Sequence, residues 1–266
     1  MTIAATDQNL RVNRQHITYA LDGGVAPRAA IGLIVLATDN TIEAEWRQIV
    51  PRFAGVGVFA SRIMNSPDIN SETLAAMEAG LVDCTAVLRP GERIDVVGYG
   101  CTSASMVIGP ANVAARVHEA RPGIPVTNPF TAALTALAAM GARHIALLTP
   151  YVDEVNQGMR RAILAENVEV PAMGSFNLPD DNAVARISEA SIEDALVELA
   201  SDPAVDAGFV ACTSLRVCGI VERAEQRIGK PITSSNHALA WHCLRLAGIR
   251  DEIDGLGRLF RTQLAA

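Results

Sequence analysis

The chain has 266 residues, of which half are hydrophobic and only 4% aromatic, and its formal net charge is −7. This acidic balance, without any basic cluster, argues against partners such as nucleic acid or an anionic membrane. No apolar run reaches the roughly 18 residues of a membrane span, and the N-terminus lacks a signal-peptide pattern, so we expect a cytoplasmic protein. The five cysteines occur without CxxC or HExxH spacing, which favours reduced thiols over disulfides and predicts no metal site.

The chain begins with residues 1–28, a polar, glycine-containing stretch that we predict to be an arm with weak structure. Ile31–Ala37 is a continuous apolar run with β-branched residues, which is typical of a strand buried on both faces. Asp39 follows this strand, where it would act as the N-cap of a helix from Ile42 or as a site residue. Further strands and helices are predicted to alternate along the chain: a strand at 57–61, a helix from Ser66 towards Leu81, a strand at 143–150, a helix at 155–164, a strand at 168–173 and a helix at 191–201.

One motif, Cys-Thr-Ser, occurs twice, at Cys101–Ser103 and at Cys212–Ser214. The first copy follows the apolar run 94–99 and the second follows 207–211, and each precedes a stretch with a helical pattern. Open α/β folds place their chemistry where a parallel strand ends and a helix begins. We therefore predict that both cysteines lie at such a position.

The repeat extends downstream, because Gly123–Asn128 and Gly229–Ser234 share a Gly-X-Pro pattern and both precede a helical segment. Such a duplication predicts an α/β fold of two similar lobes related by a pseudo-two-fold axis, each a parallel sheet flanked by helices, with the active site in the cleft between them. We assign lobe 1 to residues 29–128 and lobe 2 to residues 129–236. Residues 237–266 are predicted to form C-terminal helices that pack on lobe 1.

A cysteine at the N-terminus of a helix lies close to unpaired amides, so we expect thiol pKa values below the usual value of about 8.5. The Thr and Ser residues that follow each cysteine are suited to hold a carboxylate beside the sulfur. One thiolate would take a proton from, or add to, the carbon next to that carboxylate, and the opposite thiol would return a proton. This chemistry inverts an acidic carbon or isomerises a double bond, and it needs no cofactor.

Buried cysteines are common in protein cores and behave there as small hydrophobic residues. This is our interpretation of Cys84, Cys218 and Cys243. Core packing does not require the same Cys-Thr-Ser at two equivalent turns, so Cys101 and Cys212 are the candidate catalytic residues.

The chain resembles the aspartate/glutamate racemase superfamily, in its branch of maleate cis-trans isomerases, arylmalonate decarboxylases and ectoine-utilisation racemase-like proteins. The resemblance covers about residues 30–248 and is carried by the following segments: Gly32–Val35, Gly100–Ser103, Thr149–Asn156, Asp181–Asn182 and Ala211–Ser214. It implies a cofactor-independent site between two lobes, with Cys101 and Cys212 as the catalytic cysteines. It also implies a homodimer or a higher homo-oligomer.

The same resemblance implies substrate-binding roles for further residues. Tyr151 matches a tyrosine that helps to hold the substrate, and Asn182 matches an asparagine that contacts a substrate carboxylate. The amides and hydroxyls of the two turns would bind carboxylate oxygens through Thr102, Ser103, Thr213 and Ser214. The structural alternatives are a packing role for Tyr151 and an N-cap role for Asn182.

Two departures from the family pattern bear on the substrate. Arylmalonate decarboxylases keep only the second cysteine, so the presence of both here disfavours decarboxylation. Maleate isomerases read Pro-Ser-Ser-Asn after the first strand, whereas this chain reads Leu36-Ala-Thr-Asp39. An ionised Asp accepts hydrogen bonds but donates none, so Asp39 favours an amino or hydroxy acid over maleate. This segment is nearest to the ectoine-utilisation branch.

The main hypothesis is a cofactor-independent isomerase or racemase of a small amino or hydroxy acid, with Cys101 and Cys212 as opposed acid and base. The first alternative is cis-trans isomerisation of maleate to fumarate through covalent addition of Cys212. Arylmalonate-type decarboxylation and non-catalytic binding of a small acid are further alternatives, because two lobes and a cleft also describe binding proteins.

Overall fold

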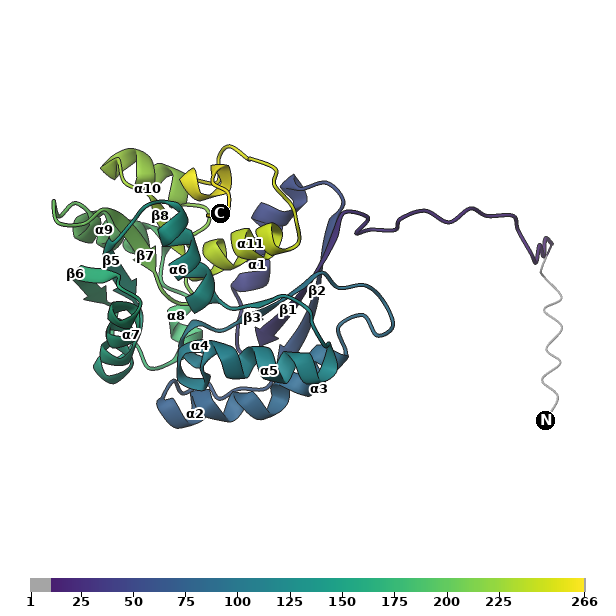
Figure 1. The fold of residues 1–266 in the computed structure, drawn as a ribbon, viewed down its shortest axis with the longest axis horizontal. Helices are drawn as coiled ribbons and strands as arrows, with labels where there is room; N and C mark the ends of the chain where they lie inside the picture. Colours follow the sequence, from purple (N-terminus) through teal and green to yellow (C-terminus); the bar gives the residue numbers. More distant parts are fainter. Residues whose placement is uncertain (1–10, 266) are drawn as a thin grey trace.

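The computed structural model describes residues 11–265, so the first ten residues of the predicted arm lie outside it. Two separate four-stranded parallel sheets form the centre of the molecule (Figure 1). The first contains β1 (Ala29–Leu36), β2 (Val56–Ile63), β3 (Val96–Gly100) and β4 (Val126–Thr127). The second contains β5 (His144–Thr149), β6 (Glu169–Ser175), β7 (Ala207–Val210) and β8 (Ile232–Ser234).

The two sheets have the same strand order. The first runs β2-β1-β3-β4 and the second runs β6-β5-β7-β8, and every pairing within them is parallel. Each sheet is therefore built from the same succession of strands and crossovers, one from each half of the chain. This confirms the predicted α/β fold of two similar, duplicated lobes.

Helices connect the strands and cover the faces of the sheets, as parallel strands require. In the first half these are α1 (Ile42–Ile49), η1 (Val50–Arg52), α2 (Ser71–Ala76), η2 (Met77–Gly80), α3 (Leu81–Ala86), α4 (Thr102–Ile108), α5 (Pro110–Ala120) and α6 (Pro129–Ala139). In the second half they are α7 (Asp153–Ala165), α8 (Asp181–Val184), α9 (Glu189–Ala200), α10 (Val221–Ile228), α11 (Ser235–Leu246) and η3 (Arg258–Arg261). No helix among residues 11–265 is long and apolar enough to cross a membrane.

The core is aliphatic, as the composition predicts. All eight residues of β1 are buried, which fits a strand covered on both faces. The last helix, α11, packs against α6 and against strands of the first sheet, and its Trp241 is fully buried. These two helices are capped at equivalent positions. The side chains of Asn128 and Ser234 accept hydrogen bonds from first-turn backbone N–H groups of α6 and α11, respectively.

Three predicted helices are wrong in detail. The helix expected from Ser66 begins at Ser71, because Asn70 forms a reciprocal capping box with Thr73 and leaves residues 65–69 as a loop. The helix expected directly after Cys212 does not form, and α10 begins only at Val221. The C-terminal region contains one α-helix, which already begins at Ser235, followed by irregular chain and a short 3-10 helix.

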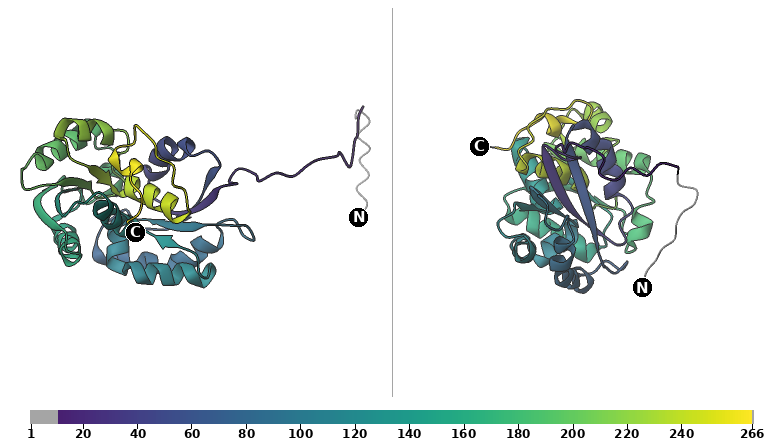
Figure 2. Two further views of the ribbon diagram at one scale, coloured as in Figure 1. Left: turned by 45° about the horizontal axis from the view of Figure 1, so that its top comes forward. Right: turned by 90° about the vertical axis from the view of Figure 1, so that its right-hand side faces the viewer.

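The part of the N-terminal arm that the structure describes leaves the body of the molecule and forms no helix or strand before β1 (Figures 1 and 2). Its base is held at Ala26 and Arg28. The Arg93 guanidinium donates a hydrogen bond to the Ala26 carbonyl at 2.8 Å, and Arg28 pairs with Asp251 at 2.5 Å.

Candidate active site

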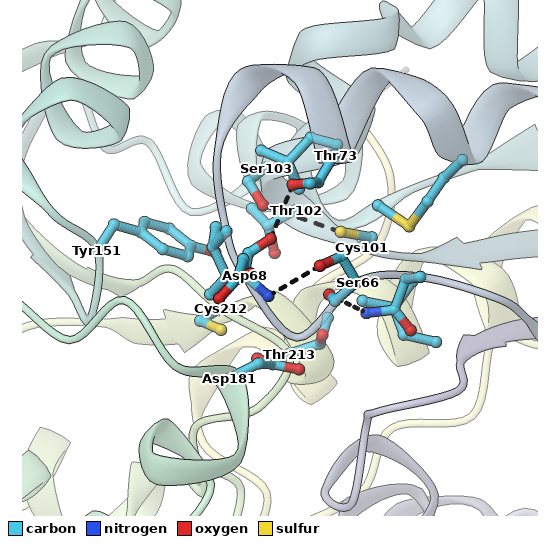
Figure 3. A pocket seen from close by; sticks show the side chains of 15 residues that line it. Ser66, Asp68, Thr73, Cys101, Thr102, Ser103, Tyr151, Asp181, Cys212 and Thr213 are labelled. Atoms are coloured by element: carbon cyan, nitrogen blue, oxygen red, sulfur yellow. Dashed lines mark hydrogen bonds between the residues drawn. The ribbon is translucent and has the colours of Figure 1, made fainter.

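A small cavity lies where the two halves of the chain meet, and both Cys-Thr-Ser turns contribute to it (Figure 3). From the first half come Cys101, Thr102 and Ser103, and from the second come Tyr151, Asp181, Cys212 and Thr213. Leu36, at the end of β1, also lines the cavity. The loop and helices after β2 supply the rest of the lining: Asn65, Ser66, Asp68, Ile69, Thr73, Leu74 and Met77. The structure therefore brings together two cysteines that lie far apart in the sequence.

The Cys101 turn is organised by the helix that follows it. Cys101 has an extended backbone and is the N-cap residue of α4, so its Sγ accepts a hydrogen bond from the Ala104 amide at 3.4 Å. The Ser105 hydroxyl, one turn further on, donates back to the Cys101 carbonyl. The hydrogen bonds of Cys101 itself therefore come from its neighbours in the sequence.

The Cys212 turn is organised by side chains from elsewhere in the chain. The Cys212 amide donates to the Ser235 hydroxyl oxygen at 3.0 Å, and the Asn236 amide group donates to the Thr213 carbonyl at 2.7 Å. The carboxylate of Glu45, on α1, accepts from the Val217 amide at 2.5 Å. A helix would have satisfied these backbone groups internally; here α1 and α11 satisfy them instead.

Ser235 also links the two turns directly. Its hydroxyl oxygen accepts from the Thr102 hydroxyl at 2.7 Å as well as from the Cys212 amide. Thr213 donates to the carbonyl of Gly100, the residue before Cys101, at 3.4 Å. These bonds set the positions of the two cysteines relative to one another.

Burial decides the protonation state of both thiols. It raises the pKa of Cys101 to about 12, against the smaller opposing effects of the Ala104 amide and the Ser103 hydroxyl. Burial likewise raises the pKa of Cys212 well above its usual value, and the charge of Asp181 raises it further. The expected lowering of the thiol pKa values is therefore wrong for these buried cysteines, because loss of water outweighs the helix N-terminus.

Tyr151 lies beside the second cysteine. It is buried, and its hydroxyl is placed to donate to Cys212, an interaction that lowers the thiol pKa against the effect of burial. The pKa of Tyr151 itself is raised well above its usual value by burial. Tyr151 is therefore a neutral hydrogen-bond donor within the cavity, next to the Cys212 thiol.

Two buried aspartates lie close to both thiols. Asp181 accepts from the Thr38 hydroxyl and from the Ser214 hydroxyl, each at 2.7 Å. Asp39 accepts from the Thr41 amide at 2.7 Å and lies outside the cavity lining. Burial raises the pKa of Asp39 to about 6, although its hydrogen bonds oppose this effect.

The predicted site residues fall into two groups. Cys101, Thr102, Ser103, Tyr151, Cys212 and Thr213 all line the cavity. Asp39, Asn182 and Ser214 do not, although Ser214 contacts the cavity residue Asp181. Asn182 is half-buried, and its Oδ1 accepts a long hydrogen bond from the Asn40 side-chain amide at 3.5 Å. Asp181, the neighbour of Asn182, occupies the cavity wall instead.

Asp181, Glu45 and Ser235 were not among the site residues predicted from the sequence. Asp181 was visible only as part of the segment Asp181–Asn182, and a one-residue shift along a short helix decides which side chain faces the cavity. Ser235 follows the second Gly-X-Pro segment, at the position that Pro129 holds in the first half. The difference between Ser235 and Pro129 at equivalent positions of the repeat was a signal that could have identified Ser235.

The cavity is small in this structure. Its volume of about 20 Å³ is enough for roughly one water molecule. Ser66 and Asp68 form one wall, and an isolated antiparallel bridge joins Asp68 to Asp180 of the second half. An organic acid therefore needs more room than the cavity has in this structure. No group of three or more His, Cys, Asp or Glu side chains suited to a metal ion occurs within residues 11–265.

The protein has two similar α/β lobes, and each half of the chain places one cysteine in a shared cavity. It belongs to the class of the aspartate/glutamate racemase superfamily. Within this class, the sequence profile of the arylmalonate decarboxylase family matches residues 31–260, and the chain belongs to this family. It is 31% identical to the arylmalonate decarboxylase of Bordetella bronchiseptica over 88% of this chain and 98% of that protein. It is 28% identical to the maleate isomerase of Nocardia farcinica over 88% of this chain and 96% of that protein.

Solved structures give the same relationship. A cysteine-to-serine variant of the Nocardia farcinica maleate cis-trans isomerase, with a covalently bound succinylcysteine intermediate, matches with a TM-score of 0.79 at 26% identity, over 88% of this chain and 98% of that one. A liganded arylmalonate decarboxylase variant, with one cysteine introduced and another replaced by serine, matches with a TM-score of 0.78 at 29% identity, over 88% and 99%. These comparisons give no support to the ectoine-utilisation subgroup.

Proposed function

We propose that the protein is a cofactor-independent isomerase that racemises a small amino or hydroxy acid, with Cys101 and Cys212 as opposed acid and base. The observation that carries this proposal is that the two thiols lie in one cavity whose described lining contains acidic but no Lys, Arg or His side chains. The proposed roles follow from the chemistry of these groups and from the charge around them.

The charge in the cavity favours a substrate with a positive group. Asp181 and Asp39 both raise the pKa of both thiols. A substrate ammonium group would oppose this effect and help one thiol to ionise, whereas a dianion would raise the thiol pKa values further. An α-amino acid carries one ammonium and one carboxylate, so it suits this cavity better than a dicarboxylate.

In the proposed reaction, one thiolate removes the α-proton from one face of the substrate. The amides of Thr102, Ser103 and Thr213 and the hydroxyl of Ser103 donate hydrogen bonds to the carboxylate, which carries the developing negative charge. The hydroxyls of Thr102 and Thr213 keep their bonds to Ser235 and to the Gly100 carbonyl. The other thiol gives its proton to the opposite face, so the configuration inverts and the two cysteines exchange protonation states. Tyr151 stabilises the thiolate form of Cys212 by donating a hydrogen bond.

Cis-trans isomerisation of maleate is the second candidate, and the succinylcysteine intermediate in the relative from Nocardia farcinica favours it. In this reaction the sulfur of Cys212 would bond to one alkene carbon while Cys101 gives a proton to the other carbon. After rotation about the new single bond, the other hydrogen of the protonated carbon leaves as a proton to Cys101 and the carbon–sulfur bond breaks, which forms fumarate and restores the Cys212 thiolate. Arylmalonate-type decarboxylation is a third candidate because of the family match.

Proton NMR in heavy water separates these candidates. Wild-type protein is incubated with amino acids, 2-hydroxy acids, maleate and an arylmalonate, beside Cys101→Ala, Cys212→Ala and the control Cys84→Ala. We expect α-proton exchange and inversion with an amino or hydroxy acid, lost in the first two variants and retained in the control.

Formation of fumarate from maleate without any α-proton exchange would replace racemisation by cis-trans isomerisation. Release of carbon dioxide from the arylmalonate alone would select decarboxylation. Retained turnover in both active-site cysteine variants would refute every mechanism that uses the thiol pair.

A further inference from the structure

The N-terminal arm carries most of the exposed large hydrophobic side chains. Every residue from 11 to 25 is exposed. Five of the eight exposed large hydrophobic side chains found among the described residues lie in this segment: Val12, Ile17, Tyr19, Leu21 and Val25. Tyr19 is 80% exposed and Leu21 is 88% exposed. A soluble chain rarely leaves such a series uncovered, so this segment has the composition of a docking element.

The apolar residues of the arm follow the period of a β-strand. Ile17, Tyr19 and Leu21 alternate with Thr18 and Ala20, so an extended arm places all three large side chains on one face. At about 3.3 Å per residue, residues 11–25 can extend roughly 50 Å from the base of the arm. This length is enough to cross a lobe of a neighbouring molecule.

An apolar groove lies on the first lobe, between α1 and β2. It has a volume of about 300 Å³, and its walls include Trp46, Val50, Val56, Val58 and Ala60. The strand β2 is the edge of its sheet, so the backbone groups on its outer side have no strand partner in this sheet. Such an edge can accept an additional strand, whose alternate side chains then enter a neighbouring groove.

The arm leaves the molecule beside the end of this groove. The Arg28 amide donates to the Gly55 carbonyl at 2.9 Å, and Ala29 pairs with Val56, which lines the groove. When the exit point of an arm and its receiving groove are neighbours, two copies related by a two-fold axis can exchange arms reciprocally. The arm extends away from its own body (Figure 2), and its residues 11–25 are all exposed.

We propose that a second copy of this chain is the partner for the arm: Ile17, Tyr19 and Leu21 of each copy dock into the groove between α1 and β2 of the other. The two grooves and the two arms then form one symmetric interface at the ends of the sheets remote from Cys101 and Cys212. This proposal is independent of the reaction catalysed.

The test is the molar mass of the full chain, measured by size-exclusion chromatography with light scattering over a dilution series. An arm variant carries Ile17→Ser, Tyr19→Ser and Leu21→Ser, and its matched control carries Thr18→Ser and Ala20→Ser on the opposite face. A groove variant carries Val58→Lys. We expect wild type and control to have twice the 28.1 kDa mass of the chain. The arm variant and the groove variant should dissociate into monomers at concentrations at least tenfold higher than the concentration at which wild type dissociates.

Mixing the arm variant with the groove variant sharpens the test. In a mixed dimer, the wild-type arm of the groove variant can dock into the wild-type groove of the arm variant. The mixture should therefore dimerise more tightly than either variant alone. A disulfide between Tyr19→Cys on one chain and Ala60→Cys on a differently tagged chain should form at dimer mass, with each single-cysteine variant as control. A monomeric wild type, a dimer unaffected by both variants, or a disulfide formed only within one chain would overturn the proposal.

Discussion

The two Cys-Thr-Ser turns have the same sequence and follow equivalent strands, but different parts of the molecule hold them. Cys101 directly caps α4, and its contacts come from residues up to four positions away. Cys212 begins an irregular turn whose backbone is bound by Ser235, Asn236 and Glu45. A repeated motif thus fixes where a residue lies along a strand, while the contacts that orient it depend on what packs against each copy.

The difference has an energetic consequence. A helix pairs its own backbone N–H groups beyond the first turn, so the Cys101 turn tolerates changes elsewhere in the molecule. The irregular turn after Cys212 leaves buried N–H groups that need side-chain acceptors. The four predictions below test this contrast, from the largest expected effect to the smallest.

The first prediction concerns the thiols themselves. Cys101→Ser and Cys212→Ser should each lower kcat by roughly 10² to 10⁴, because each removes one partner of the acid–base pair. Although different contacts hold the two turns, both cysteines should thus be equally necessary for activity. Steady-state kinetics on the substrate found by NMR measures this effect, with Cys84→Ser as the control that retains activity. A variant that keeps more than about a tenth of the activity would show that its turn has another role.

The second prediction separates the supports of the two turns. Glu45→Ala removes the acceptor for the Val217 and Cys218 amides and for Asn236. Since a buried unsatisfied donor costs about 1–3 kcal/mol, the free energy of unfolding should fall by roughly 3–5 kcal/mol in urea titrations. The matched change beside the first turn, Ser105→Ala, should cost only about 1 kcal/mol. Equal losses in the two variants would contradict the contrast drawn above.

The third prediction concerns Asp39, whose charge acts on both turns. Its pKa is raised from 3.8 to about 6 in the folded protein, so the folded state binds this proton more tightly than the unfolded state. The resulting stabilisation is complete below about pH 4 and is lost as the pH rises through about 6. Asp39→Asn should therefore be more stable than wild type by about 3 kcal/mol at pH 8 and equal to it near pH 4.

Paired urea titrations of wild type and Asp39→Asn across this pH range measure the difference, in which the titration of other groups cancels. The same variant should lower the pKa of both thiols, because Asp39 raises both. A stability difference that does not change with pH would show that Asp39 is ionised in the folded protein throughout the range.

The fourth prediction tests the direct link between the turns. Ser235→Ala leaves the Cys212 amide and the Thr102 hydroxyl without their shared acceptor, which should cost about 1–2 kcal/mol of stability. It should also lower kcat while KM changes little, because the thiols lose their relative position. Ser234→Ala, which removes the cap of α11, should cost about 1 kcal/mol without lowering kcat. A fall in kcat of the same size in both variants would make Ser235 merely structural.

Much of the fold could be predicted from the sequence, because periodic apolar runs have local causes. The buried strand β1, the duplicated order of strands and helices and the capped helices α6 and α11 all follow from residues close together in the chain. The helix expected after Cys212 is wrong because a tertiary contact competes with a local pattern. Residues 213–220 have helical character in sequence, but Glu45 takes the amides that a helix would have used.

The sequence by itself determined the duplicated α/β fold and the pair of cysteines, since a strand that ends in Cys-Thr-Ser is a local feature that occurs twice. Only the tertiary structure decided that Asp181 rather than Asn182 faces the cavity, that Ser235 joins the two turns, and that the thiol pKa values rise instead of falling. The physical reason is that orientation, shared hydrogen bonds and exclusion of water depend on groups far apart in the chain, which meet only when both lobes are packed.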